Sequence, residues 1–181
     1  MRIALAGAHA VGKSTLAAEL AVALPGHRVV EEAYYQLEGE GYVFSESPSL
    51  EDFEAQLERS LRCVREERGD VIFDRSPADY LAYMLAHRDA ARAAPAYWLP
   101  RIREACAALE LIVFVPIEHP DRIAAGREAP RLRRRVDATL REALVDDEWD
   151  LGGTVLEVRG TPGERAQQVL AHLAVAGLIR R

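Results

Sequence analysis

The residues from Gly7 to Thr15, GAHAVGKST, have the types and the spacing that bind a phosphate group. They match the pattern GxxxxGK(S/T), in which glycines let backbone N–H groups turn inward around a phosphate. In this pattern Lys13 is predicted to bridge the β- and γ-phosphates of ATP during catalysis, and the Ser14 hydroxyl to hold Mg²⁺. The residues expected to bind the nucleotide here are Gly7, Ala8, His9, Ala10, Val11, Gly12, Lys13, Ser14 and Thr15. His9 either touches a phosphate or only fills the loop.

Lys13 is the only lysine in the chain, whereas arginine accounts for 22 of the 23 basic residues. A compact ammonium on a thin stem fits between phosphates, and a planar guanidinium does not. The lysine therefore stands where arginine cannot replace it, which favours binding of ATP or GTP. An NKxD motif would need a second lysine, so the sequence disfavours a GTP-specific switch protein.

A phosphate loop of this kind needs a strand before it and a helix after it, and the sequence predicts both. Apolar runs predict strands over 2–7, 27–31, 70–74, 109–116 and 154–158. Helices are predicted over 13–24, 49–69, 77–88, 96–108, 130–146 and 162–176, with a loop between the second strand and Pro48. This alternation predicts an α/β fold, namely a P-loop NTPase three-layer sandwich around a five-stranded parallel sheet. We expect a single domain over residues 1–181.

Acidic and basic side chains follow the third predicted strand in the segment FDRSPADY. Asp74 ends the strand beside the phosphate loop, where a carboxylate can hold Mg²⁺ together with Ser14. We expect Arg75 to bridge the catalytic base and the transferred phosphoryl group. Asp79 either hydrogen-bonds acceptor hydroxyls or caps the helix that follows Pro77.

Basic residues gather again after the fourth predicted strand, in a segment of about 118–146 that we expect to act as a lid. The apolar stripe predicted for its helix recurs every four residues: Leu132, Val136, Leu140 and Leu144. At about 100° per residue, Arg131 and Arg135 flank one side of this stripe and Arg133 flanks the other. We therefore predict that Arg131 and Arg135, with Arg127 one turn earlier, face the phosphoryl group as catalytic residues. The alternative is a solvated basic face.

Together, the phosphate loop, the DRS element and the arginine lid resemble the nucleoside and nucleotide kinase group of P-loop proteins. The segment VPIEHPDRIAAGR is similar to the start of the adenylate kinase lid, VPxExxxDRIxGR, with one extra residue between Ile123 and Gly126. That resemblance implies that Arg122 stacks on the adenine and that Arg127 contacts phosphates.

The FDRSPADY element and the glutamate after the second strand look closer to ribosylnicotinamide-kinase-like AAA-type ATPases and to deoxynucleoside kinases. In those families a glutamate at this place acts as base, and the DRS element binds magnesium and positions the acceptor. The stretch VEEAYY stands where the usual pattern is ExAR, so that Glu31 matches the glutamate and Tyr34 replaces the arginine.

The acceptor is expected against residues 31–68, and no lysine or arginine occurs between Val29 and Glu58. A phosphate acceptor would need arginines to hold it, which only Arg59, Arg62 and Arg65 on the next helix could supply by turning inward. A hydroxyl acceptor needs a carboxylate that takes its proton. The sequence therefore favours a phosphotransferase acting on a hydroxyl of a small neutral or cationic metabolite.

Within this region Glu31 is the expected base, and Glu32 is the alternative because a shift of one residue exchanges the two. The residues expected to contact the acceptor are Glu31, Glu32, Tyr34, Arg75 and Asp79, and those expected beside the adenine are Gly160 and Thr161. A nucleoside monophosphate kinase and a nucleotide-binding regulatory ATPase remain as alternative functions.

The composition narrows the class of partner. A net charge of −6 argues against nonspecific binding of nucleic acid or of anionic membranes. Cys63 and Cys106 lack CxxC spacing, which is typical of reduced thiols in a cytoplasmic protein. No apolar run approaches the length of a membrane span. The expected partner is a small-molecule acceptor with a free hydroxyl, and a homodimer is left open.

Overall fold

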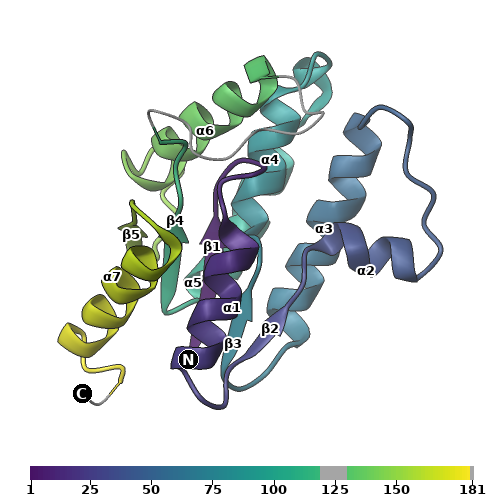
Figure 1. Ribbon diagram of the computed structural model, residues 1–181. Helices are drawn as coiled ribbons and strands as arrows, with labels where there is room; N and C mark the ends of the chain where they lie inside the picture. Colours follow the sequence, from purple (N-terminus) through teal and green to yellow (C-terminus); the bar gives the residue numbers. More distant parts are fainter. Residues whose placement is uncertain (119–129, 180–181) are drawn as a thin grey trace.

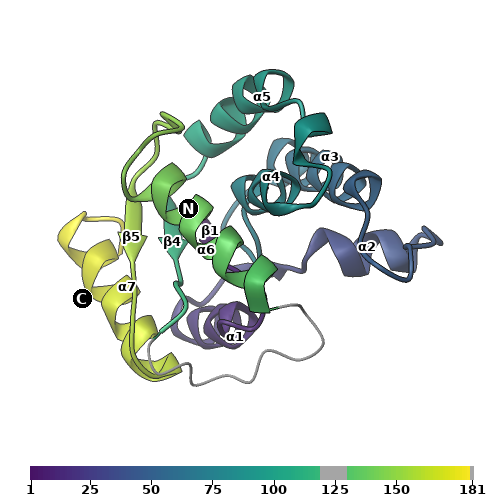
Figure 2. The ribbon, with the colours of Figure 1, turned by 90° about the horizontal axis from the view of Figure 1, so that it is seen from above.

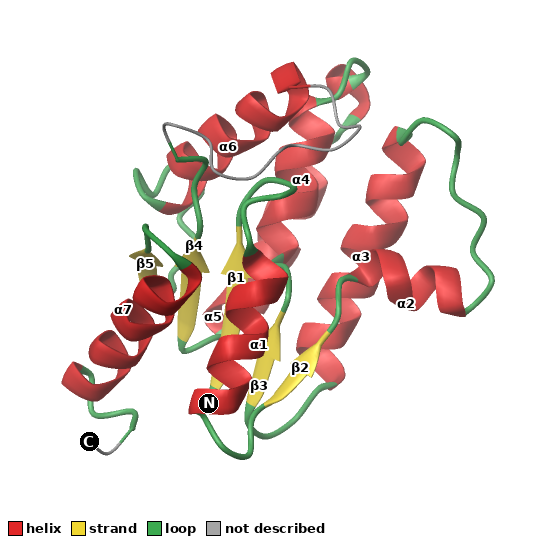
Figure 3. Cartoon of the chain, in the orientation of Figure 1, coloured by secondary structure: helices red, strands yellow, loops and turns green. Residues whose placement is uncertain are grey.

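The computed structural model of the chain describes residues 1–118 and 130–179. Its centre is a sheet of five parallel strands in the order β2-β3-β1-β4-β5. The strands are β1 (Arg2–Ala6), β2 (Arg28–Val30), β3 (Val71–Phe73), β4 (Leu111–Phe114) and β5 (Val155–Glu157). Ile3 of the central strand pairs with Ile72 of β3 and with Leu111 of β4. The predicted α/β class and five-stranded parallel sheet are confirmed (Figure 3).

Helices cover both faces of the sheet. They are α1 (Lys13–Ala23), α2 (Ala33–Gly39), α3 (Leu50–Glu66), α4 (Pro77–Ala86), α5 (Pro95–Ala107), α6 (Pro130–Leu144) and α7 (Pro162–Val175), with a 3₁₀ turn at Ala90–Arg92. The pair α1 and α7 lies on one face, and α3, α4 and α5 lie on the other (Figure 1 and Figure 2). Helix α6 packs on α4, and α2 packs on α3. Every residue of β3 and β4 is buried, as the apolar runs VIF and LIVF require of strands covered on both faces.

Helix α2 lies in the segment that the sequence analysis assigned to a loop, so that assignment is wrong for residues 33–39. The glycine- and serine-rich composition that suggested a loop begins only at Gly39, whereas Gln36, Leu37 and Glu38 suit a helix. Contacts with α3 stabilise it, because Arg59 donates to the Gln36 side chain and pairs with Glu40. Helix α3 begins at a capping box formed by Ser49 and Asp52, close to the start of the helix predicted over 49–69.

Two further observations concern the cysteines and the length of the helices. Cys63 and Cys106 are both free thiols. Within residues 1–118 and 130–179, none of the helices combines the length and the apolar character that crossing a membrane requires.

Candidate active site

The phosphate loop connects β1 to α1, and two of its glycines meet steric requirements. A Cβ added at Gly7 would lie 2.4 Å from the carbonyl oxygen of Val115, which follows β4. Gly12, directly before α1, has a φ of 92°, a left-handed conformation that favours glycine. Ala10 also lies in the left-handed region with a φ of 53°, so the middle of the loop is strained and must be held by its surroundings.

Cationic side chains hold five consecutive backbone carbonyls of this loop. Gly7 O accepts from Arg75 Nη1 at 3.4 Å, Ala8 O from Lys13 Nζ at 2.9 Å, His9 O from Arg133 Nε at 2.7 Å, Ala10 O from Arg133 Nη2 at 2.9 Å, and Val11 O from Arg165 Nη1 at 2.5 Å. In a planar trans peptide the C=O and N–H point in opposite directions. Holding the carbonyls of His9, Ala10 and Val11 therefore fixes the N–H groups of Ala10, Val11 and Gly12 on the other side, as a phosphate site requires.

One face of α4 holds the first half of the loop. Asp79 Oδ1 accepts from the Gly7 N–H at 2.8 Å, and the Tyr83 hydroxyl accepts from the His9 N–H at 2.8 Å. Asp79 also forms the capping box of α4 with Ser76 and is fully buried. Its carboxylate is thus engaged inside the protein, which favours the capping role over contact with an acceptor hydroxyl. The side chain of His9 is exposed.

Lys13 is the first residue of α1, and Asp74 directly follows β3. Both side chains are buried. Burial, and after it the charge of Arg75, lower the pKa of Lys13 to about 8. Burial raises the pKa of Asp74, against the effect of the nearby Ser14 hydroxyl. Among the described residues, Asp74 Oδ1 accepts no hydrogen bond although it is buried.

This unsatisfied carboxylate oxygen beside an exposed serine hydroxyl fits a Mg²⁺ ion. Mg²⁺ takes one or two protein oxygens and fills its remaining positions with water and phosphate. Asp74 and Ser14 are therefore suitable to hold it, and their binding of Mg²⁺ stays a prediction.

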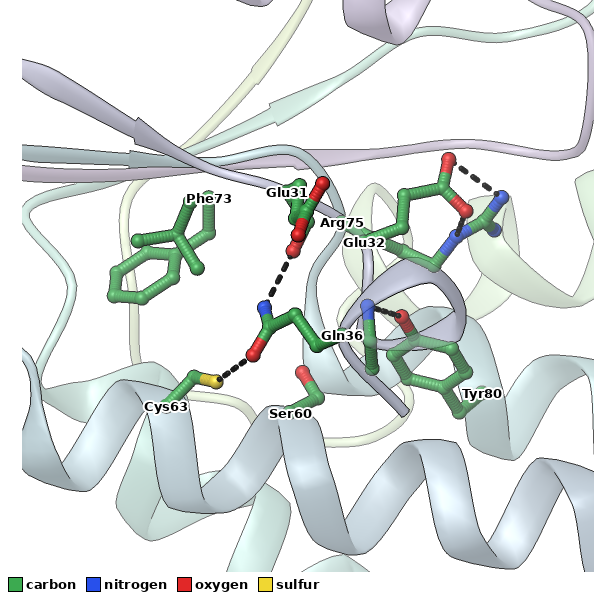
Figure 4. A pocket seen from close by; sticks show the side chains of 10 residues that line it. Glu31, Glu32, Gln36, Ser60, Cys63, Phe73, Arg75 and Tyr80 are labelled. Carbon is green, nitrogen blue, oxygen red and sulfur yellow. Dashed lines mark hydrogen bonds and ion pairs between the residues drawn. The ribbon is translucent and has the colours of Figure 1, made fainter. Parts of the chain in front are cut away.

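Glu32 and Arg75 form a bidentate ion pair next to Lys13. Arg75 Nε lies 3.0 Å from Glu32 Oε2, and Arg75 Nη2 lies 3.3 Å from Glu32 Oε1 (Figure 4). Burial alone would raise the pKa of Glu32, but Arg75 and Lys13 hold it below its ordinary value. Burial would likewise lower the pKa of Arg75, but Glu32 and other neighbours hold it well above the ordinary value. Both side chains are therefore charged.

Of the two candidate bases that the sequence left open, Glu32 is the one whose carboxylate lies beside Arg75 and Lys13. The Glu31 side chain is exposed, and its backbone carbonyl accepts from Gln36 Nε2 at 2.7 Å. Strand β2 ends at Val30, and Glu32 is the N-cap residue of α2, which the sequence analysis did not predict. The chain direction set by α2 turns Glu32 toward Arg75 (Figure 4).

A small cavity opens beside this ion pair, between β2, α2 and α3. Its lining includes the side chains of Glu32, Gln36, Ser60, Cys63, Arg75 and Tyr80 (Figure 4). Tyr34 is outside this lining, because its ring stacks on Phe44 with centroids 4.3 Å apart. Arg59 pairs with Glu40, and Arg62 and Arg65 are exposed on α3.

On α6, Arg133 reaches the phosphate loop, whereas Arg131 and Arg135 do not, so their predicted contact with the phosphoryl group stays a prediction. Arg131 and Arg135 are exposed, whereas Arg133 is 4% exposed and contacts His9 and Ala10. The buried face of α6 consists of Arg133, Val136, Leu140, Ala143 and Leu144. Leu132, from which the predicted stripe started, is only partly buried, so the true stripe is rotated onto Arg133. Arg122 and Arg127 lie outside the described residues.

Two further residues beside the phosphate loop, Arg165 and Glu118, were not predicted from the sequence. Arg165 Nη2 lies 3.0 Å from Glu118 Oε1, which also accepts from the Gly160 N–H at 2.6 Å. Gly160 thus lies in a turn connected to the phosphate loop, while Thr161 caps α7. Arg165 shares the buried face of α7 with Val169 and Leu173. A single arginine on an apolar stripe is the signal that would have revealed it.

Comparison with known proteins supports this description of the fold. A thymidylate kinase from Candida albicans superposes with a TM-score of 0.65 at 15% identity, over 97% of this chain and 92% of that one. A deoxyadenosine kinase from M. mycoides gives a TM-score of 0.67 at 14% identity, over 97% of this chain and 100% of that one. A shikimate kinase from Aquifex aeolicus gives 0.59 at 17% identity, over 98% and 99%. No curated protein matches the sequence.

These structures share the fold of P-loop kinases, so the resemblance noted from the sequence is confirmed at the level of the fold. A family model described as an AAA domain matches residues 2–165, which include the phosphate loop, the Glu32–Arg75 pair and Arg165. The chain therefore belongs to this AAA-domain family.

Proposed function

We propose that the chain is an ATP- and Mg²⁺-dependent phosphotransferase that moves the γ-phosphoryl group to a hydroxyl of a small neutral or cationic metabolite. The observation that carries the proposal is the Glu32 carboxylate, which is ionised, paired with Arg75 and close enough to Lys13 to shift its pKa. A hydroxyl acceptor needs a carboxylate beside the phosphate-binding lysine, because the carboxylate takes the proton of the hydroxyl. A phosphate acceptor does not need such a base.

The chain's own residues account for binding of the donor. The backbone N–H groups of Ala10, Val11 and Gly12 lie opposite the carbonyls that Arg133 and Arg165 hold, and they would bind the phosphates. The Lys13 ammonium would leave Ala8 O for the β- and γ-phosphates. Mg²⁺ bound by Asp74 and Ser14 would neutralise charge on the phosphates.

On the acceptor side, Glu32 would take the hydroxyl proton as the bond from oxygen to phosphorus forms. Arg75 fixes the orientation of the carboxylate through two hydrogen bonds, and its charge faces the developing negative charge on the phosphoryl group. Tyr80 and Tyr83 lie under the guanidinium, at 5.8 and 5.5 Å from their ring centroids, and keep it in place.

The side chains around the cavity beside Glu32 support a neutral or cationic acceptor, although the cavity itself, of about 10 Å³, has room for only about one water molecule. Its lining, as drawn from the described residues, contains one guanidinium, that of Arg75, which is already paired with Glu32. The remaining polar side chains are those of Gln36, Ser60, Cys63 and Tyr80, which are all neutral. Glu31 also borders the cavity, but its side chain is exposed to solvent. Such a lining offers hydrogen bonds to hydroxyl and amino groups but no cation for an acceptor phosphate.

The structural neighbours include both kinds of acceptor by their names. Deoxyadenosine kinase and shikimate kinase are named for acceptors with hydroxyl groups, and thymidylate kinase is named for a nucleoside monophosphate. The neighbours therefore support a kinase, and the lining of the cavity supports the hydroxyl acceptor.

The test is a metabolite panel incubated with the protein, ATP and Mg²⁺, in which phosphorylated products are detected by mass spectrometry. Nucleosides, ribosides, amino sugars and aminoglycosides form one half of the panel, and nucleoside monophosphates form the other. We expect product from the first half. Turnover with monophosphates alone would identify a nucleoside monophosphate kinase, and ATP binding without any product would favour a regulatory ATPase.

A further inference from the structure

Arg165 is a buried arginine that contacts the phosphate loop from α7, far from it in the sequence. It is 6% exposed, and its Nη1 donates to the carbonyl of Val11 at 2.5 Å. The next peptide N–H along the chain belongs to Gly12, whose φ of 92° is maintained only if the preceding peptide keeps its direction. Arg165 therefore acts on the orientation of the Gly12 N–H, one of the groups that face the phosphate site.

Glu118 anchors this arginine. Its side chain is 12% exposed and that of Arg165 is 7% exposed, so the pair is shielded from water. The same carboxylate oxygen accepts the Arg165 Nη2 at 3.0 Å and the Gly160 N–H at 2.6 Å. These contacts fix the position of the guanidinium. Removal of either charge would leave the other buried without a partner charge, which costs stability.

We infer that Arg165 is a positioning residue for phosphate binding, which holds the Val11–Gly12 peptide in the orientation that directs the Gly12 N–H to the donor phosphates. The inference rests on the proposed binding of a nucleotide donor, but it does not depend on the acceptor. Arg165 itself touches no phosphate in this assignment, because its two terminal nitrogen atoms, Nη1 and Nη2, contact Val11 and Glu118. Its Nε is buried and has no hydrogen-bond partner among the described residues.

The proposed role of Arg165 predicts which ligands bind more weakly when this arginine is replaced. The Gly12 N–H would contact the phosphates and not the base of the nucleotide. Loss of Arg165 should therefore lower the affinities for ATP and for inorganic tripolyphosphate by the same factor. Through Glu118, Arg165 also touches the turn at Gly160, which the sequence analysis placed beside the adenine. If Arg165 acted through that turn instead, its loss would lower the affinity for ATP alone.

The experiment is calorimetric titration of the intact protein with Mg-ATP and with magnesium tripolyphosphate. Three variants are compared: Arg165→Met, Arg165→Lys and Arg159→Met. Arg159 is a matched control, because it is exposed, lies near the same turn and pairs with Glu157 on the surface. Its replacement removes the same charge without touching the phosphate loop, which controls for long-range attraction of the anion.

We expect Arg165→Met to weaken both ligands by about tenfold, as the loss of one hydrogen bond to a charged donor would. Arg165→Lys should lose less, because an ammonium can still donate to Val11 O but cannot also hold Glu118 with a second nitrogen. Methionine and lysine have similar stems, so a space-filling role would be served equally by both. Arg159→Met should leave both affinities unchanged.

Three outcomes would overturn the inference: Arg165 variants that bind both ligands as the wild type does, a loss for ATP only, or equal affinities of the methionine and lysine variants. If Arg165→Met does not fold, Arg165→Gln takes its place, because the shorter neutral side chain cannot reach both Val11 O and Glu118. Unchanged affinities of that variant for both ligands would contradict the inference. A wild-type protein that binds neither ligand would instead refute the proposed nucleotide function.

Discussion

Replacement of Glu32 by glutamine separates the proposed base from the rest of the site. The glutamine keeps the size of the side chain and one acceptor oxygen for Arg75, but it cannot take a proton from an acceptor hydroxyl. Loss of a positioned general base lowers kcat by about 10²- to 10⁴-fold. The affinity for ATP should change little, because the donor groups of the phosphate loop are held by Arg133, Arg165 and α4.

The same substitution has a cost in stability that the structure allows us to bound. Arg75 is buried and its ion pair with Glu32 is nearly so, with side chains 5% and 18% exposed. Breaking a buried pair destabilises a protein by about 3–5 kcal/mol. The lower end applies, because the glutamine oxygen and Asp79, 3.4 Å from Arg75 Nη1, still accept from the guanidinium. A loss of about 3 kcal/mol lowers Tm by roughly 6–12 °C in a chain of this size, which leaves a folded protein to assay.

The assay measures kcat, the KM for ATP and Tm for Glu32→Gln and for Glu31→Gln, with the acceptor that the metabolite panel identifies. The Glu31 variant is the matched control, since it makes the same change one residue earlier on an exposed side chain. We expect kcat of the control within about twofold of the wild type. A Glu32 variant with kcat within tenfold of the wild type, or a Glu31 variant that loses activity instead, would refute the assignment of the base.

Three further predictions concern the phosphate loop. Arg133→Met should weaken ATP binding by about tenfold, measured by calorimetry, whereas the exposed neighbour Arg134→Met should not. Since Lys13 loses its proton near pH 8 in the free protein, the affinity for inorganic tripolyphosphate should fall as pH rises through about 8, and titrations between pH 7 and 9.5 would show proton uptake on binding. Gly7→Ala should destabilise the protein and reduce ATP binding, as seen by thermal unfolding with and without ATP, because its Cβ would lie 2.4 Å from Val115 O.

The parts of the site that the sequence predicted correctly are those fixed by local rules. The spacing from Gly7 to Ser14 specifies a strand–loop–helix unit, and the structure has β1, the loop and α1 at these residues. No local rule distinguishes Glu31 from Glu32. Neighbouring side chains point in different directions, and only the turn from β2 into α2 decides which of the two faces the site. Helix α2 in turn depends on its packing against α3, which no local pattern records.

The arginines that hold the phosphate loop show why charge patterns mislead in a helix that packs on protein. Four arginines in five residues surround a predicted apolar stripe that begins at Leu132, and the helical angle from that stripe puts Arg133 on the flank opposite Arg131 and Arg135. Helix α6 packs on α4, and its first turn ends beside the carbonyls of His9 and Ala10, which need donors because they are turned outward. An arginine satisfies two such carbonyls at once with its planar fork, so its burial costs less than that of an unpaired charge. Arg165 on α7 follows the same reasoning at Val11. An isolated arginine on the apolar face of a helix therefore indicates nearby outward-facing carbonyls, and in this fold those belong to the phosphate loop.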